Sequence, residues 1–172
     1  AAGRSGEVVY DRAGSVFARC ALPRASIDAA LDGAALLHCS GITSALGPVP
    51  RQGLRTLWRM AQEAAIPVSF DCNYRPSLWQ GRLAEARREL AAGLSVATVA
   101  FADARVLALV MGDAAPRSGE EAFARLARKA FSRYPGLRQI AATSRLEQSS
   151  SRHELRGMLA TREGIIIVSV VA

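Results

Sequence analysis

The sequence is poor in lysine, histidine, cysteine and aromatic residues, and several kinds of functional site are missing with them. Among its 172 residues there are two histidines and three cysteines, and Lys129 is the only lysine. The cysteines, Cys20, Cys39 and Cys72, lie far apart and make no CxxC pair, and no histidine is spaced with them as in a zinc site. We therefore expect no metal ligands and no disulfide framework, but buried free thiols in a reducing cytoplasm.

Long apolar runs and the common nucleotide and nucleophile motifs are also missing. No apolar run approaches about 18 residues, so we expect no membrane-spanning helix, and we expect no signal peptide at the start of the chain. There is no GxxxxGK[ST] loop and no GxGxxG segment after a strand, so neither a Walker-type nor a Rossmann-type nucleotide site is predicted. Ser40-Gly41 does not supply the GxSxG of a nucleophile elbow.

Positive charge is abundant, and it is carried almost wholly by arginine. The formal net charge is +7. A basic balance is typical of proteins that bind nucleic acid or a membrane surface. Here the arginines are scattered along predicted helices with few aromatic residues among them. This distribution favours solvated helix faces and an anionic small substrate over nucleic acid.

Half of the residues are hydrophobic, and short apolar runs alternate with amphipathic helical segments. The apolar runs predict strands at 7–10, 34–39, 66–70, 97–101, 137–143, 154–160 and 165–171. Helical spacing and end signals predict helices at 26–31, 50–65, 82–94, 103–111 and 118–134, with Ser26 capping the first and Gly112 ending the fourth. The pattern predicts one α/β domain of three layers, with a mainly parallel central sheet, helices on both faces and a final strand pair.

Polar side chains follow the predicted strand at 66–70. Asp71, Asn73 and Arg75 occur within five residues of its end. In an open α/β sheet, ligands bind outside the carboxyl ends of the strands. Asp can hold a metal or accept a hydroxyl proton, Asn can bind a hydroxyl both ways, and Arg can fork onto a carboxylate or phosphate. The alternative is a polar turn closed by Pro76, with Arg75 paired to a surface acid.

Five segments of the chain occur in an order that resembles one enzyme family. They are Tyr10–Ser15, Leu37–Thr43, Phe70–Trp79, Ala100–Gly112 and Ile140–Arg145. Together they resemble the ribokinase-like (PfkB-type) carbohydrate kinases, and most closely the branch that phosphorylates 2-keto-3-deoxygluconate. The resemblance covers roughly residues 7 to 160 and implies a ribokinase-like fold that is partial in this chain.

The resemblance implies a cytoplasmic enzyme that uses ATP and Mg²⁺ to transfer a phosphoryl group to a hydroxyl of a sugar acid. Such a transfer depends on positioning and charge neutralisation, which arginines and a metal ion supply. The substrate-binding positions that the family implies are Tyr10, Arg12, Asn73 and Arg75, with Arg12 facing the carboxylate. The positions toward the nucleotide are Asp71, Asp103, Thr143 and Arg145.

The chain departs from the family where the family is rich in glycine. The family's Gly-Ala-Gly-Asp-type loop, which carries the catalytic Asp, should follow residue 160, but residues 161–172 form an atypical apolar tail. Val106 stands where the family's Asn-x-x-Glu-type motif has a carboxylate. We therefore assign no catalytic residue, and we predict that residues 1–172 are a single partial kinase domain that does not turn over substrate.

Two other classes of function stay open. One is a non-catalytic α/β remnant or interaction module that keeps the core of the fold. The other is nucleic-acid binding through the net charge, which the sequence favours less than binding of a sugar acid and ATP. The apolar tail also offers an exposed strand edge that can pair with another chain, which leaves a homo-oligomer open.

Overall fold

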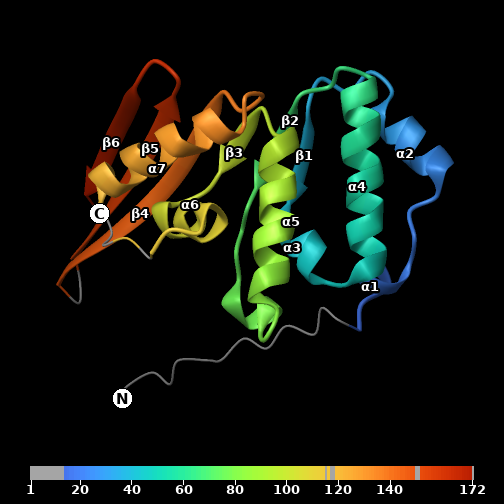
Figure 1. Ribbon diagram of the computed structural model, residues 1–172, viewed down its shortest axis with the longest axis horizontal. Coiled ribbons are helices and arrows are strands. Elements are labelled where there is room, and N and C mark those ends of the chain that lie inside the picture. Colours follow the sequence, from blue (N-terminus) through green and yellow to red (C-terminus); the bar gives the residue numbers. More distant parts are fainter. Residues whose placement is uncertain (1–13, 115, 117–118, 150–151, 172) are drawn as a thin grey trace.

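The computed structural model describes residues 14–114, 116, 119–149 and 152–171 (Figure 1). The strand predicted at 7–10 and the predicted substrate-binding residues Tyr10 and Arg12 lie outside these residues. Within the described part of the chain, no helix is long and apolar enough to cross a membrane.

A six-stranded sheet runs through the described residues, and its strands follow each other in chain order. They are β1 (Leu37–Ser40), β2 (Val68–Asp71), β3 (Val99–Phe101), β4 (Gln139–Ser149), β5 (Arg152–Thr161) and β6 (Ile165–Val171). The first four strands are parallel neighbours, and β4, β5 and β6 pair antiparallel. The predicted strands among the described residues are confirmed with shifted ends, and so is the final strand pair.

The helices are α1 (Val16–Arg19), α2 (Arg24–Leu31), α3 (Gly41–Ala45), α4 (Pro48–Glu63), α5 (Leu83–Val96), α6 (Ala104–Met111) and α7 (Glu120–Arg133), with the 3₁₀ turn η1 (Pro76–Trp79). The five predicted helices are confirmed, whereas α1, α3 and η1 are too short to give a periodic signal. The prediction that Ser26 caps α2 is wrong, because the helix begins two residues earlier at Arg24, after Pro23. Gly112 ends α6 as predicted, with a φ of 75°.

One face of the sheet is sealed by helices. On it lie Phe70, Ala100, Ile140 and Ala160, which are neighbours across four strands and are all fully buried. The indole of Trp58, from α4, meets the Phe70 ring edge to face with the centroids 5.7 Å apart. Helix α5 approaches the same ring at Gly93, which has no side chain to hold it away.

The helices that join the parallel strands all lie on this same face (Figure 1). Helices α4 and α5 cover Phe70. Helix α7 is held against the sheet by the ion pair between its Glu120 and Arg156 of β5, whose N···O distance is 2.6 Å. The strands are in sequential order, and right-handed crossovers in one direction fall on one side of a sheet. Of the three predicted layers, the described residues therefore supply the sheet and one helical layer.

Arg162, in the turn between β5 and β6, anchors this hairpin to the end of α7. Its guanidinium donates to the carbonyl oxygens of Phe131, Tyr134, Pro135 and Leu137 at 2.8–3.3 Å. The last carbonyls of a helix have no partner within the helix, so a guanidinium at this position satisfies them. The tip of the hairpin is thereby held in one place relative to α7.

We expect Gly93→Ala to destabilise the protein, because the added Cβ would overlap the Phe70 ring. Overpacking a core typically costs about 1–3 kcal/mol. Gly53 on α4 is the matched control, because a Cβ there lies 3.5 Å from the nearest side-chain atom of Leu22. Gly53→Ala should keep or raise stability, since alanine favours helix over glycine. Urea unfolding measures both, and a Gly93→Ala protein as stable as the unsubstituted chain would contradict this packing.

Candidate functional site

A cleft of about 390 Å³ lies at the carboxyl ends of β2 and β3, beside residues 141–143 of β4. Asp71, Phe101 and Ala141 are neighbours in the sheet register, so β2 and β3 end at the same level, whereas β4 continues beyond it to Ser149. The cleft is lined by residues 71–75, 101–103, 105–106 and 141–143. This is the edge at which open α/β sheets bind ligands.

The turn after β2 begins one wall of the cleft. The carboxylate of Asp71 accepts a hydrogen bond from the backbone N–H of Asn73 at 3.0 Å. Asn73 has a φ of 36°, in the left-handed region that asparagine adopts more readily than most residues. The N–H of Cys72 donates to the carbonyl of Phe101 at 3.0 Å and keeps the turn attached to β3. The turn carries Asn73 and Arg75 into the lining of the cleft.

Asp103 contributes a second carboxylate. One of its oxygens caps α6 by accepting from the N–H of Val106 at 2.9 Å, and the other accepts from the Arg105 guanidinium at 3.0 Å. Sequence reasoning missed Arg105, which also lines the cleft. A signal was present, because Arg105 follows the end of β3 at the same spacing at which Arg75 follows the end of β2.

The structure brings most of the predicted site residues together. The lining of the cleft contains Asp71, Asn73, Arg75, Asp103 and Thr143. Arg145 lies farther along β4, opposite Leu155. Tyr10 and Arg12 fall outside the described residues. A second hollow of about 400 Å³ lies beside Arg75 and Arg105, so two guanidinium groups border the same region. The arrangement suits an anionic ligand.

The cysteine near this site is not a nucleophile. Cys72 is fully buried, and burial, together with the charges of Asp71 and Asp103, raises the pKa of its thiol far above the usual range. Burial also raises the pKa of Cys39 to about 11. Both thiols are therefore protonated at neutral pH. The prediction of buried thiols is wrong for Cys20, which is exposed just after the short helix α1.

The carboxylates of the cleft fit a magnesium ion that is shared with phosphate. Mg²⁺ is usually held by one or two carboxylates together with substrate phosphates and water. Asp71 and Asp103 both line this cleft. Among the described residues, no cluster of three His, Cys, Asp or Glu side chains forms a metal cage of its own. The fit is therefore to a metal that arrives with phosphate.

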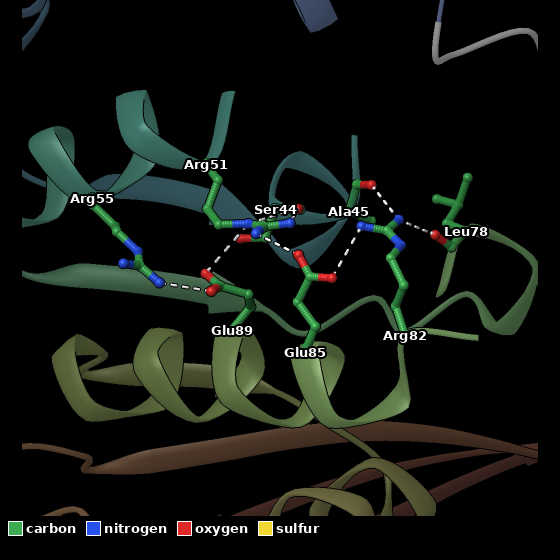
Figure 2. Close-up of polar contacts among 8 residues, drawn as sticks. All are labelled: Ser44, Ala45, Arg51, Arg55, Leu78, Arg82, Glu85 and Glu89. Atoms are coloured by element: carbon green, nitrogen blue, oxygen red, sulfur yellow. Dashed lines mark hydrogen bonds and ion pairs between the residues drawn. The ribbon is translucent and has the colours of Figure 1, made fainter. Parts of the chain in front are cut away.

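An ion-pair network lies between α4 and α5 (Figure 2). Its centre is Glu89, which is only 2% exposed. Arg55 pairs with one Glu89 oxygen at 2.6 Å, and Arg51 lies 3.8 Å from the other. Arg51 also pairs with Glu85 and donates to the carbonyl of Ser44 in α3 at 3.0 Å. The network thus joins α3, α4 and α5.

Arg82 extends this network to the segment that carries the site. Its guanidinium donates to the carbonyl of Ala45, at the end of α3, and to that of Leu78, in η1, at 2.9 and 2.7 Å (Figure 2). The N–H of Leu78 in turn donates to the carbonyl of Arg75 at 2.9 Å. The backbone of Arg75 is therefore held by Leu78 and, through it, by Arg82, and neither of these two residues lines the cleft.

No family model matches this chain. The curated 2-dehydro-3-deoxygalactonokinase of Haloferax volcanii is 34% identical to it over 118 residues, which are 68% of this chain and 37% of the relative. The chain therefore spans little more than a third of that relative's length.

Solved structures extend the similarity to the fold. A PfkB family carbohydrate kinase from Listeria grayi matches with a TM-score of 0.82 and 28% identity, over 96% of this chain and 49% of that one. The 2-dehydro-3-deoxygluconokinase of Thermotoga maritima matches with a TM-score of 0.84 and 27% identity, over 99% of this chain and 51% of that one. An E. coli protein solved with ATP and Mg²⁺, at 16% identity and a TM-score of 0.59, shares the fold alone. The chain spans about half the length of the first two structures.

We expect Glu89→Gln to destabilise the protein by about 1.5 kcal/mol, because the buried carboxylate loses its charge-assisted contacts with Arg51 and Arg55. The loss is limited, since Arg51 keeps Glu85 and the Arg55 side chain is already 58% exposed. Glu63→Gln is the matched control, since Glu63 makes an exposed pair with Arg59 on α4, and such pairs contribute about 0.5 kcal/mol. Thermal and urea unfolding measure the difference. Equal effects of the two substitutions would show that the network carries little of the stability.

The thiols should differ sharply in reactivity. In the native protein at pH 8, a disulfide reagent such as DTNB should modify Cys20 rapidly, whereas Cys39 and Cys72 should react only after unfolding, because both are buried and protonated. Cys20→Ser should remove the fast phase and leave the other two thiols unchanged. Fast modification of a second thiol in the native Cys20→Ser protein would contradict this assignment.

Proposed function

This chain resembles the PfkB-type carbohydrate kinases in both fold and sequence, and from this premise we propose that its cleft is the sugar-acid site of such a kinase. The substrate we propose is 2-keto-3-deoxygluconate, with ATP as the phosphoryl donor. The observation that carries the proposal is the meeting of an amide, two guanidinium groups and two carboxylates in one cleft at the strand ends.

The substrate side of the proposed site is formed by the turn after β2. Arg75 forks onto the sugar-acid carboxylate through two parallel N–H donors. Asn73 donates to one sugar hydroxyl and accepts from another through its amide. Tyr10 and Arg12 complete this side in our proposal, with Arg12 as a second partner for the carboxylate. Arg105 adds positive charge at the rim.

The nucleotide side is formed by the carboxyl ends of β2 and β3 and by residues 143–145 of β4. In our proposal Asp71 and Asp103 hold a magnesium ion together with the phosphates of ATP, and Thr143 and Arg145 contact the nucleotide. When bound, Mg²⁺ supplies neutralisation of the charge that spreads over the transferring phosphoryl oxygens. The protein's own part is to orient the acceptor hydroxyl toward the phosphate and to keep both anions in place.

We propose that this chain binds the sugar acid and ATP but does not transfer the phosphoryl group. A kinase needs a group that orients or accepts the proton of the attacking hydroxyl, and backbone donors for the phosphate. Asp71 is engaged with the N–H of Asn73, and Asp103 is engaged with Val106 and Arg105. Neither lies in a glycine-rich loop before a helix. We therefore keep the assignment of no catalytic residue in this chain.

Calorimetry with 2-keto-3-deoxygluconate tests the binding site. Arg75→Ala should weaken binding at least tenfold, since a hydrogen bond to a charged group contributes about 1.5–3 kcal/mol. Arg24→Ala on α2 is the control, because Arg24 is an exposed arginine outside the cleft lining, and it should bind as the unsubstituted chain does. If Arg75→Ala leaves the affinity for 2-keto-3-deoxygluconate unchanged, the cleft is not the sugar-acid site.

A coupled ADP-release assay with Mg-ATP and 2-keto-3-deoxygluconate tests the absence of turnover. We expect no release above the rate without sugar acid. Clear turnover that is lost with Arg75→Ala would show that a residue of this chain replaces the family's catalytic Asp.

A further inference from the structure

The guanidinium of Arg75 lines the cleft without a protein group that orients it. Among the described residues, the exposed side chain of Arg75 makes no hydrogen bond and no ion pair. The surface ion pair that the sequence left open for Arg75 is therefore not found in this part of the chain. An arginine side chain has many rotamers, and without a partner its direction depends on the backbone that carries it. The place of this guanidinium in the cleft is thus set by the backbone at residue 75.

That backbone is fixed to the 3₁₀ turn η1, which begins at the next residue. Arg75 has φ −118° and ψ 103°, an extended conformation that a residue before proline prefers. Its carbonyl accepts a hydrogen bond from the N–H of Leu78 at 2.9 Å, which closes the first turn of η1. The orientation of Arg75 therefore follows that of η1.

Two side chains hold η1 in place. Trp79 is 3% exposed and packs with Ala45 of α3 and Ala86 of α5, so it determines where η1 lies against these helices. The guanidinium of Arg82 lies 5.0 Å from the centroid of the Trp79 ring. Its Nη2 donates to the carbonyls of Leu78 and Ala45 at 2.7 and 2.9 Å (Figure 2). Arg82 thereby determines the direction in which the Leu78 carbonyl points.

Arg82 also joins the segments that follow two neighbouring strands. Ala45 is the last residue of α3, which follows β1 directly, whereas Leu78 belongs to the segment that follows β2. The carbonyl at the end of a helix has no partner within the helix, so it is available to Arg82. The Nη1 of Arg82 lies 3.5 Å from Glu85, which pairs with Arg51 of α4. One guanidinium therefore ties η1 to α3 and, through Glu85, to α4.

We propose that Arg82 is a positioning residue for the anion site, because it holds η1 where the guanidinium of Arg75 enters the cleft. Arg82 does not line the cleft itself and acts through Leu78 and the backbone of Arg75. Groups that bind a ligand need support from neighbours that do not touch it, since a small displacement costs much of the interaction. The inference rests on the proposed function, which gives Arg75 the contact with the carboxylate of the sugar acid.

A double-mutant cycle tests whether Arg82 acts through Arg75. In calorimetry with 2-keto-3-deoxygluconate, Arg82→Ala should weaken binding roughly fivefold, less than Arg75→Ala does, because the guanidinium of Arg75 is displaced but still present. The double variant should bind as weakly as Arg75→Ala alone, since Arg82 then has nothing left to position. Arg82→Lys should restore part of the affinity, because its single ammonium has to serve both carbonyls and Glu85.

Arg55→Ala is the matched control. It removes another guanidinium of the same network, the one that pairs with Glu89 at 2.6 Å, and it lies outside the lining of the cleft. This variant should lower the free energy of unfolding and leave the affinity for the sugar acid unchanged. Circular dichroism checks that every variant is folded.

Amide hydrogen exchange measures the positioning without any ligand. In Arg82→Ala the N–H of Leu78 should exchange roughly tenfold faster, because its hydrogen bond to the carbonyl of Arg75 opens more often. The N–H of Cys72, which donates to the carbonyl of Phe101 in the neighbouring strand, should keep its protection. This pair of amides separates loosening of η1 from general loss of stability.

The outcomes separate the two proposals. Unchanged exchange at Leu78 in Arg82→Ala overturns the positioning role, and so do additive losses of affinity in the double variant. An equal loss of affinity in Arg55→Ala also overturns it, because lower stability would then account for both. If the unsubstituted chain does not bind 2-keto-3-deoxygluconate, the proposed function fails, while the exchange at Leu78 still decides whether Arg82 holds this segment.

Discussion

The burial of Phe70 is the contact on which the rest of the structure depends. Its ring is enclosed by Trp58 of α4 and by the bare backbone of Gly93 in α5, and it is fully buried. These contacts fix both helices against β2. The next residue along the strand is Asp71, whose side chain points to the other face because successive side chains alternate. The packing that orders the core therefore also sets the starting point of the cleft.

The polar network around Glu89 also holds α4 and α5 together, in addition to this apolar contact. Glu89 is buried between two helices and compensated by arginines from α4, while Arg82 reaches the carbonyls of α3 and η1. At Gly41 the start of α3 packs directly against the backbone of Cys72, because a Cβ there would overlap the Cys72 carbonyl. Two contacts thus hold the segment from Cys72 to Arg75, namely the packing of Gly41 against the carbonyl of Cys72 and the hydrogen bonds from Arg82 through Leu78 to Arg75. Neither involves a side chain of the cleft lining.

The features that could be predicted from the sequence are those that periodicity and composition determine. Apolar runs and helical stripes located the strands and long helices, and the family resemblance drawn from five short segments agrees with the relatives and with the fold. Short elements such as α3 escaped, since five residues hold too little of a helical repeat. The prediction of Ser26 as a helix cap was wrong because α2 begins earlier, directly after Pro23. Arg105 was overlooked because its closeness to Arg75 is a property of the sheet register and not of either segment alone.

The anchoring of Arg162 has a consequence for how β6 finds its place. Residues 165–168 are Ile-Ile-Ile-Val, so the strand has no alternation of apolar and polar residues that could distinguish one face from the other. A slip by one residue would exchange the two faces of a strand, and here it would cost little in apolar burial. The pairing register is instead determined by the turn, which the N–H of Thr161 closes by donating to the carbonyl of Gly164 at 2.8 Å. The guanidinium of Arg162 ties this turn to the carbonyls at the end of α7. A polar contact at the tip of the hairpin thus decides which apolar side chains face the core and which face outward.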